Sequence, residues 1–239
     1  MNGRRGVLPM RDRPYTLLSC ALSLDGYLGT ATPRRLELSN DADFDRVDAV
    51  RASCDAILIG AATVRHDNPR LLVRSDARRE ERKARGLAAS PIKVTVTRRG
   101  ELDPQADFFV AGDTEKLVYC TSERVGDARS RLGPVATVLD GGQPVDMRSI
   151  SSDLRDRGVD RLMVEGGGNI HTQFLTANLV DELQLVVAPF FVGDSRAPRF
   201  VRDGRFPWNP DRRATLSSVR QIDDVVLLRY ALSPRFQDG

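Results

Sequence analysis

Apolar runs that suit buried strands alternate with segments of helical spacing along most of the chain. The runs that predict strands are residues 15–22, 54–59, 92–97, 116–120, 136–139, 161–165, 183–190 and 225–230. The spacing of apolar residues predicts helices at about 42–52, 61–66, 147–157 and from 169 toward 177. This alternation favours a single α/β domain with a doubly wound, mostly parallel sheet. The last two strands have no helical pattern between them, so we expect antiparallel edge strands at the C-terminal end.

The length and composition of the chain agree with one large domain. Of its 239 residues, 41% are hydrophobic and 29% are charged, which excludes a mostly disordered protein. The predicted elements place the domain at residues 13–232, and we expect loose ends at 1–12 and 233–239. The most polar stretch, residues 74–90, interleaves both charge signs and predicts a solvated loop or a short surface helix.

The charge and the apolar runs limit the partners and the location of the protein. A formal net charge of +3 is close to balance for this length, so we expect no nucleic-acid partner. No apolar run approaches the ~20 residues that cross a bilayer, so we expect no membrane segment. Residues 1–14 contain four arginines without an apolar stretch behind them, which does not fit a secretory signal. We therefore expect a cytoplasmic protein.

Cysteine and histidine usage argues against metal and disulfide chemistry. Cys20, Cys54 and Cys120 lie far apart and form no C-x-x-C pair, so we expect each to be a small buried residue. His66 and His171 belong to no H-x-E or H-E-x-x-H pattern. We therefore predict a site without metal, which excludes zinc-dependent hydrolysis or deamination.

Three predicted strand ends carry the residues best suited to bind a ligand, because open α/β sheets bind ligands beyond the carboxyl ends of their strands. These ends are residues 23–26, 60–71 and 165–169. The glycines at 166–168, between a strand and a helix, fit either a phosphate cradle or a tight turn. Gly60-x-x-Thr63 forms a second strand–helix junction of this kind. Two such loops in one domain favour a dinucleotide over a lone anion.

Charged residues lie near these junctions. Arg98 and Arg99 directly follow the predicted third strand, where two guanidinium groups would suit the 2′-phosphate of a cofactor. Arg51 and Arg74 flank the second strand, although a single arginine is more often a solvated surface charge. The carboxylates at the three strand ends are Asp25, Asp67 and Glu165. They would converge if the strands are neighbours, but aspartate before glycine or proline is also ordinary turn chemistry.

Several short motifs, taken together and in their order along the chain, are specific enough to indicate a protein family. The motifs are Ser23-Leu24-Asp25-Gly26, Arg51 with residues 55–60, Thr63-Val64-x-x-Asp67-x-Pro69-x-Leu71, residues 165–168, Leu179-Val180-Asp181-Glu182-Leu183, Ala188-Pro189 and Val192-Gly193. Over residues 14–231 this set resembles the reductases of riboflavin biosynthesis, the family of the RibD C-terminal domain. The resemblance implies a dihydrofolate-reductase-like fold, a homodimer and NADPH as cofactor. It implies reduction of the ribose of a phosphoribosylamino-pyrimidine to a ribityl chain.

The resemblance also indicates which reductase type to expect. The substrate would be 5-amino-6-(5-phosphoribosylamino)uracil or its 2,5-diamino-pyrimidinone counterpart. In many bacteria this reductase is fused to a zinc deaminase, which needs H-x-E and P-C-x-x-C. The chain contains neither motif, so it resembles a free-standing reductase.

Matched by position, the family's functional residues fall on two groups of residues in this chain. Those that would contact NADPH are Ala21, Leu36, Thr63, Asp67, Gly167, Gly168, Asn169 and Ile170. Those that would contact the substrate are Arg34, Arg51, Leu71, Arg74 and Glu165. Hydride would reach C1′ of the ring-opened ribose, present as an imine, and Asp67 or Glu165 would stabilise its positive charge.

The chain departs from the family pattern at two positions. It has Asp67-Asn68-Pro69 where the family usually has Asp-Asp-Pro, and Ser19 where a lysine or asparagine commonly precedes the Ser-Leu-Asp-Gly turn. Two alternatives therefore stay open. The chain could reduce a different heterocycle, such as dihydrofolate or a precursor of a specialised metabolite, or it could be a non-catalytic nucleotide-binding paralogue.

Overall fold

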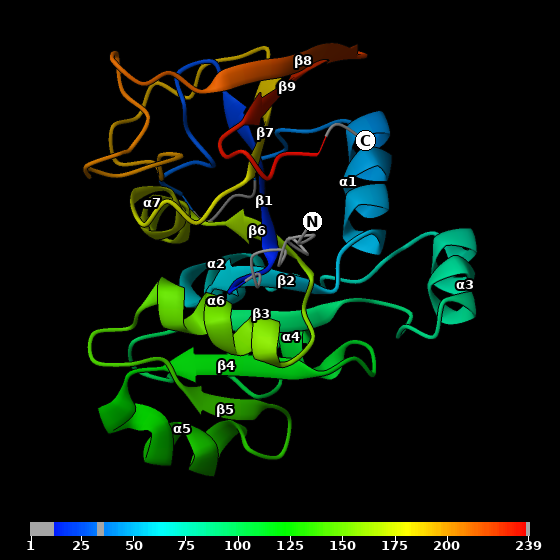
Figure 1. Ribbon diagram of the computed structural model, residues 1–239, viewed down its shortest axis with the longest axis vertical. Helices are drawn as coiled ribbons and strands as arrows, with labels where there is room; N and C mark the ends of the chain where they lie inside the picture. Colours follow the sequence, from blue (N-terminus) through cyan, green and yellow to red (C-terminus); the bar gives the residue numbers. More distant parts are fainter. Residues whose placement is uncertain (1–11, 33–35, 238–239) are drawn as a thin grey trace, which may run out of the picture.

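A nine-stranded sheet runs through the protein, with helices on both of its faces (Figure 1). The computed structural model describes residues 12–32 and 36–237. The strands are β1 (Tyr15–Ser23), β2 (Ala56–Gly60), β3 (Ile92–Val96), β4 (Lys116–Cys120), β5 (Thr137–Asp140), β6 (Arg161–Gly166), β7 (Glu182–Ala188), β8 (Thr215–Ile222) and β9 (Val225–Ala231). The helices are α1 (Asp41–Ala52), α2 (Ala61–Asp67), α3 (Asp76–Ala84), α4 (Asp107–Val110), the 3₁₀ turn η1 (Ser122–Arg124), α5 (Val125–Leu132), α6 (Met147–Asp156) and α7 (Gly168–Thr176).

The sheet is parallel except at one edge. Its strand order is β5-β4-β3-β2-β6-β1-β7-β9-β8. Strands β1 to β7 run parallel to their neighbours, whereas β9 pairs antiparallel with β7 and β8 pairs antiparallel with β9. Strand β6 lies between β1 and β2, so the carboxyl ends of these three strands are adjacent. The predicted α/β class, with antiparallel C-terminal edge strands, is confirmed.

Alternate residues of the central strands build two separate cores. Leu18 and Leu58 pack on the face that α6 and α7 cover, together with Phe174. Leu17 and Ile57 point to the opposite face, where they pack against residues of α2, α4 and α5. Successive side chains of a strand point to opposite faces, so apolar runs without polar interruptions suit a sheet covered on both sides.

The polar stretch predicted as a loop or a short surface helix contains α3. One of its arginines is not a surface charge, because Arg82 is 3% exposed. Its guanidinium donates to the backbone carbonyls of Ala52, Cys54 and Ala88. These bonds fix the end of α1, and therefore the orientation of its last turn.

The Leu179–Leu183 motif fastens the two ends of the domain. Asp181 is fully buried and accepts hydrogen bonds from the Arg13 guanidinium, the Thr16 amide and the Ser233 hydroxyl. Burial alone would raise the pKa of Asp181, but these donors hold it below its usual value. Residues 233–237, which we expected to be loose, are therefore tied to the domain. Of the other residues in that expectation, Asp12 is exposed, and 1–11 and 238–239 lie outside the described residues.

Candidate active site

A polar cleft of about 340 Å³ opens between α1 and the carboxyl halves of β1 and β6. Its lining residues are Ser19, Cys20, Ala21, Leu28, Ser39, Asp43, Phe44, Arg46, Val47, Arg51, Thr63, Asp67, Arg74, Met163, Glu165 and Gly167. Seven residues predicted for the site are among them, namely Ala21, Arg51, Thr63, Asp67, Arg74, Glu165 and Gly167. Motifs more than a hundred positions apart in the sequence thus meet in one place.

Arg51 and Glu165 form an ion pair inside the cleft. Arg51 Nε and Nη2 donate to the two carboxylate oxygens of Glu165 at 2.6 Å each. Burial would lower the pKa of Arg51, but the Glu165 carboxylate raises it above its ordinary value. Glu165 therefore has its charge compensated by Arg51, and both side chains are held in fixed positions.

Arg74 lines the same cleft and packs over Phe44 of α1. Its guanidinium carbon is 5.5 Å from the centre of the Phe44 ring, a cation–π distance. Its backbone amide donates to Asp48 at 2.5 Å, as does the amide of Ser75 at 3.2 Å. The buried carboxylate of Asp48 thus fixes the backbone that carries Arg74 against α1, while the guanidinium stays exposed.

Asp67 ends α2 and is exposed at the mouth of the cleft. Among the residues that the structure describes, no ion pair or hydrogen bond compensates its side chain. The following residue, Asn68, has a left-handed backbone with φ of 42° and accepts a hydrogen bond from the Asp107 amide at 2.7 Å. Asparagine tolerates this conformation, so the departure from Asp-Asp-Pro leaves the turn intact and faces α4 rather than the cleft.

The glycine-rich loop joins β6 to α7. A Cβ atom at Gly167 would lie 3.4 Å from Thr63 Oγ1, so the two strand–helix junctions face each other. A Cβ atom at Gly168 would instead collide with the backbone carbonyl oxygen of Arg199. The missing Cβ at Gly168 therefore permits close packing of the chain, and its contact with NADPH stays a prediction. The Gly168 and Asn169 amides at the start of α7 have no partners within the helix and suit an anion, whereas the Ile170 amide donates to the Gly167 carbonyl.

The buried side chain of His171 packs against this glycine-rich loop. Its ring is fully buried, and burial lowers its pKa to about 4 despite the hydrogen bond of Nδ1 with the Phe200 carbonyl at 3.2 Å. The imidazole is therefore neutral at pH 7, and Nδ1 carries the proton. Its Nε2 atom lies 3.4 Å from where a Cβ of Gly166 would stand, so the histidine packs against the loop.

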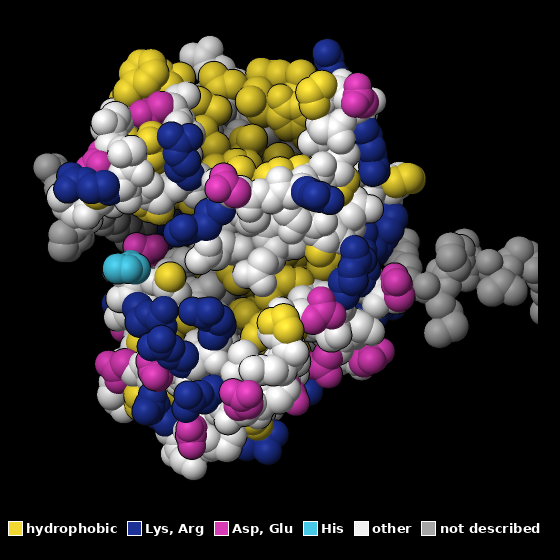
Figure 2. Space-filling view, turned by 90° about the vertical axis from the view of Figure 1, so that its left-hand side faces the viewer, with side chains coloured by type: hydrophobic (Ala, Val, Ile, Leu, Met, Phe, Trp, Pro, Cys, Tyr) yellow, Lys and Arg dark blue, Asp and Glu magenta, His cyan; other side chains and the backbone are white. Residues whose placement is uncertain are grey.

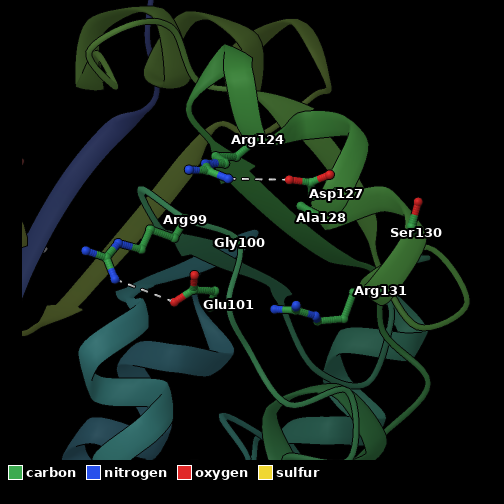
Figure 3. A pocket seen from close by; sticks show the side chains of 8 residues that line it. All are labelled: Arg99, Gly100, Glu101, Arg124, Asp127, Ala128, Ser130 and Arg131. Carbon is green, nitrogen blue, oxygen red and sulfur yellow. Dashed lines mark hydrogen bonds and ion pairs between the residues drawn. The ribbon is translucent and has the colours of Figure 1, made fainter.

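A second, shallower cleft of about 590 Å³ lies at the ends of β3 and β4. It is lined by Arg99, Gly100, Glu101, Arg124, Asp127, Ala128, Ser130 and Arg131. Figure 3 shows Arg124 and Arg131 facing the loop that carries Arg99 and Glu101. Figure 2 looks onto this edge of the molecule, where Lys and Arg side chains gather below the centre. Because β6, β2, β3 and β4 are consecutive in the sheet, this cleft lies about 10–15 Å from the glycine loop.

Several predicted site residues lie elsewhere. Leu71 is 2% exposed and packs in a core, and Ile170 is 4% exposed and packs against Gly60. Leu36, Asn169 and Arg98 line neither cleft, and Arg34 falls outside the described residues. Asp25 accepts hydrogen bonds from Ser23 and from the amides of Val192 and Gly193. These bonds outweigh the effect of desolvation and lower its pKa to about 2, so its role is in a turn.

Apart from Arg51, the sequence interpretation missed the contribution of α1 to the cleft. Asp43, Val47 and Arg51 are spaced by four residues and share one face of the helix, with Arg46 beside them. That spacing is visible in the sequence, but aspartate and arginine on a short helix are usually read as its solvated face.

The sheet order, the cores on both faces and the cleft at the strand ends define a domain of the dihydrofolate-reductase-like class. Residues 14–228 match the RibD C-terminal domain, and the chain belongs to this family.

Two archaeal relatives support this membership. A protein of Archaeoglobus fulgidus named 2,5-diamino-6-ribosylamino-4(3H)-pyrimidinone 5′-phosphate reductase is 34% identical over 188 residues, 78% of this chain and 85% of the relative. A protein of the same name from Methanothermobacter thermautotrophicus is 36% identical over 198 residues, 80% of this chain and 85% of the relative. The solved RibD of Acinetobacter baumannii has a TM-score of 0.75 and 25% identity over 92% of this chain, which spans 58% of that protein. The predicted family and fold are thus confirmed.

Proposed function

We propose that this protein is an NADPH-dependent reductase that converts a phosphoribosylamino-pyrimidine to its ribitylamino form. The observation that carries the proposal is the meeting of Asp67, the Arg51–Glu165 pair and Arg74 with Gly167 in one cleft. The names of the archaeal relatives support the reaction and the substrate class.

The residues present fit a reduced dinucleotide. Gly167 and Thr63 lie against each other where the two strand–helix junctions meet, and the start of α7 adjoins them, so a chain of phosphates would bind along these junctions. The arginine-lined second cleft lies across two further strands, where it would hold the adenosine end. When bound, the nicotinamide would supply the hydride that adds to C1′ of the substrate.

The protein's own residues would orient the substrate and balance its charge. Arg74 and the remaining N–H groups of Arg51 would bind the 5′-phosphate, because guanidinium forks match phosphate oxygens. Phe44, Val47 and Met163 supply apolar walls that exclude water from the reacting carbon. Asp67, whose charge is not compensated within the described part of the chain, would face the cation that develops at the imine.

The test is direct. The purified protein is incubated with NADPH and either the 2,5-diamino-pyrimidinone phosphate or its deaminated uracil counterpart, and the absorbance of the reduced cofactor is followed. We expect rapid oxidation of NADPH with at least one of them, and slow oxidation with the dephosphorylated compound or with dihydrofolate. If neither pyrimidine phosphate is reduced, the proposal is wrong.

We expect NADPH to be preferred to NADH. Replacing Arg98 and Arg99 by alanine should weaken NADPH binding by about 1.5–3 kcal/mol for each charge-assisted hydrogen bond lost, and leave NADH binding nearly unchanged. Arg220→Ala, an exposed arginine on the edge strand β8, serves as the matched control. Titration of the two cofactors decides the matter, and an equal loss for both would remove these arginines from the cofactor site.

We further propose a cytoplasmic homodimer. The edge formed by β8 and β9 exposes Leu216, Val219 and Val226, and Figure 2 shows a broad apolar surface at the same end of the molecule. We expect sedimentation at twice the 26.5 kDa chain mass, and Val219→Asp to shift the protein toward the monomer. A monomeric native protein would contradict this.

The three cysteines are free, as suits a reducing compartment. No described helix is long and apolar enough to span a membrane.

A further inference from the structure

One carboxylate in the wall of the cleft has an oxygen that accepts no hydrogen bond from the described part of the chain. Asp43, in the first turn of α1, is 1% exposed and lines the cleft. Its Oδ1 atom accepts a hydrogen bond from Arg46 Nε at 2.7 Å. Its Oδ2 atom is shielded from solvent and has no hydrogen-bond partner in the described part of the chain. Burying a carboxylate oxygen without a hydrogen-bond donor costs free energy. Because this oxygen lies beside a ligand cleft, a donor group of the ligand would compensate that cost.

The guanidinium of Arg46, which donates to Asp43, is also held by Gln184. Arg46 Nη1 donates to Gln184 Oε1 at 2.6 Å, and Gln184 Nε2 donates to the buried Glu182 at 2.8 Å. Within residues 12–32 and 36–237 these contacts leave Arg46 Nη2 available, and the side chain is only 10% exposed. Asp43 and Arg46 therefore present an acceptor and a donor next to each other, both held by buried neighbours.

The short side chain of Ser19 leaves room at this end of the cleft. Ser19 lies opposite Gln184 in the β1–β7 ladder and lines the cleft with Asp43 and Arg46. The family commonly has a longer residue at this position, so the polar groups here come from α1 instead of β1. Arg74, which packs over Phe44 in the same cleft, belongs to the region assigned to the phosphate.

We propose that Asp43 and Arg46 recognise the pyrimidine ring and select its 2-amino form, an inference that rests on the proposed function. The 2-amino-4(3H)-pyrimidinone edge presents two donors, the 2-amino group and N3–H, followed by the C4 oxygen as acceptor. The Asp43 carboxylate pairs with the two donors after rotation about its Cβ–Cγ bond, a soft torsion. Arg46 Nη2 donates to the C4 oxygen. The uracil form has a C2 oxygen, which would face the carboxylate and be repelled.

The test compares kcat/KM for the diamino and deaminated phosphates in the native protein and in Asp43→Asn. The native protein should prefer the diamino ring by at least about tenfold, since a bidentate pair of this kind discriminates by roughly 10–100-fold. An asparagine amide can donate to the C2 oxygen, so Asp43→Asn should abolish or reverse the preference. Asp45→Asn is the matched control, because Asp45 lies two residues away, is exposed and pairs with Arg78.

A second variant tests the role of Arg46. Arg46→Met should lower kcat/KM for both ring forms, because both carry the C4 oxygen, and should also reduce the preference, because it removes the Nε donor that holds Asp43 Oδ1. Thermal melts identify any variant that fails to fold, in which case the preference of the native protein alone decides. Equal use of both rings by the native protein, or an unchanged ratio in a folded Asp43→Asn, overturns the inference. The proposed function would survive either result and fails only if neither ring is reduced.

Discussion

Replacing Asp67 by asparagine should lower kcat by about 10²–10³-fold, the usual effect of losing one group that stabilises charge in the transition state. Three carboxylates line the cleft, and two of them have their charge compensated, Asp43 by Arg46 and Glu165 by Arg51. Glu165 is paired with Arg51 through both oxygens, whereas Asp67 has no such partner in the described part of the chain. The uncompensated carboxylate interacts more strongly with a cation at the reacting carbon. Asparagine has the same shape, so the loss would report the charge.

The same substitution should leave stability unchanged. Asp67 is exposed at the end of α2, and surface substitutions of this kind usually alter the free energy of unfolding by less than about 0.5 kcal/mol. Glu165→Gln is the informative comparison, because it leaves the Arg51 guanidinium without its counter-charge and should lower the melting temperature. Full turnover in Asp67→Asn, together with a large loss in Glu165→Gln, would assign the stabilising role to Glu165.

Much of the fold could be predicted from the sequence because its central strands are buried on both faces. Runs such as residues 54–59 contain no polar alternation, which is the pattern of a parallel strand between two helical layers. Strand β8 was missed because its apolar residues, Leu216, Val219 and Ile222, recur every third position. A strand at the edge needs no continuous apolar face, and a register shift between Leu216 and Ser218 disturbs the alternation further.

Part of the site could be predicted from the sequence because the sheet is mostly parallel. Carboxyl ends of parallel strands share one edge of the sheet, so residues after β1, β2 and β6 were expected to converge. The sequence does not show which strands are neighbours. Strand β6 inserts between β1 and β2, and this places Glu165 against Arg51, so that only the remaining N–H groups of that arginine can reach a phosphate. The sequence also does not show which atoms pack next to each glycine, since a missing Cβ can make room either for a ligand or for another segment of the chain.

Gly167 and Gly168 should therefore respond differently to the same substitution. We expect Gly168→Ala to destabilise the protein by about 3 kcal/mol, because the new methyl group would overlap the Arg199 carbonyl oxygen, and a backbone atom cannot move aside as a flexible side chain can. For a domain of this size, such a loss lowers the melting temperature by about 6–12 °C.

Gly167→Ala provides the matched comparison. Its methyl group would lie 3.4 Å from Thr63 Oγ1, an ordinary contact, and its φ of −86° is accessible to any residue. The protein should melt as the native one does, yet bind NADPH about tenfold more weakly, since the methyl group occupies the space between the two strand–helix junctions. Calorimetry and cofactor titration on both variants separate the two roles. A Gly167→Ala protein with native cofactor affinity would place the phosphates elsewhere, and a stable Gly168→Ala protein would show that the segment around Arg199 can move.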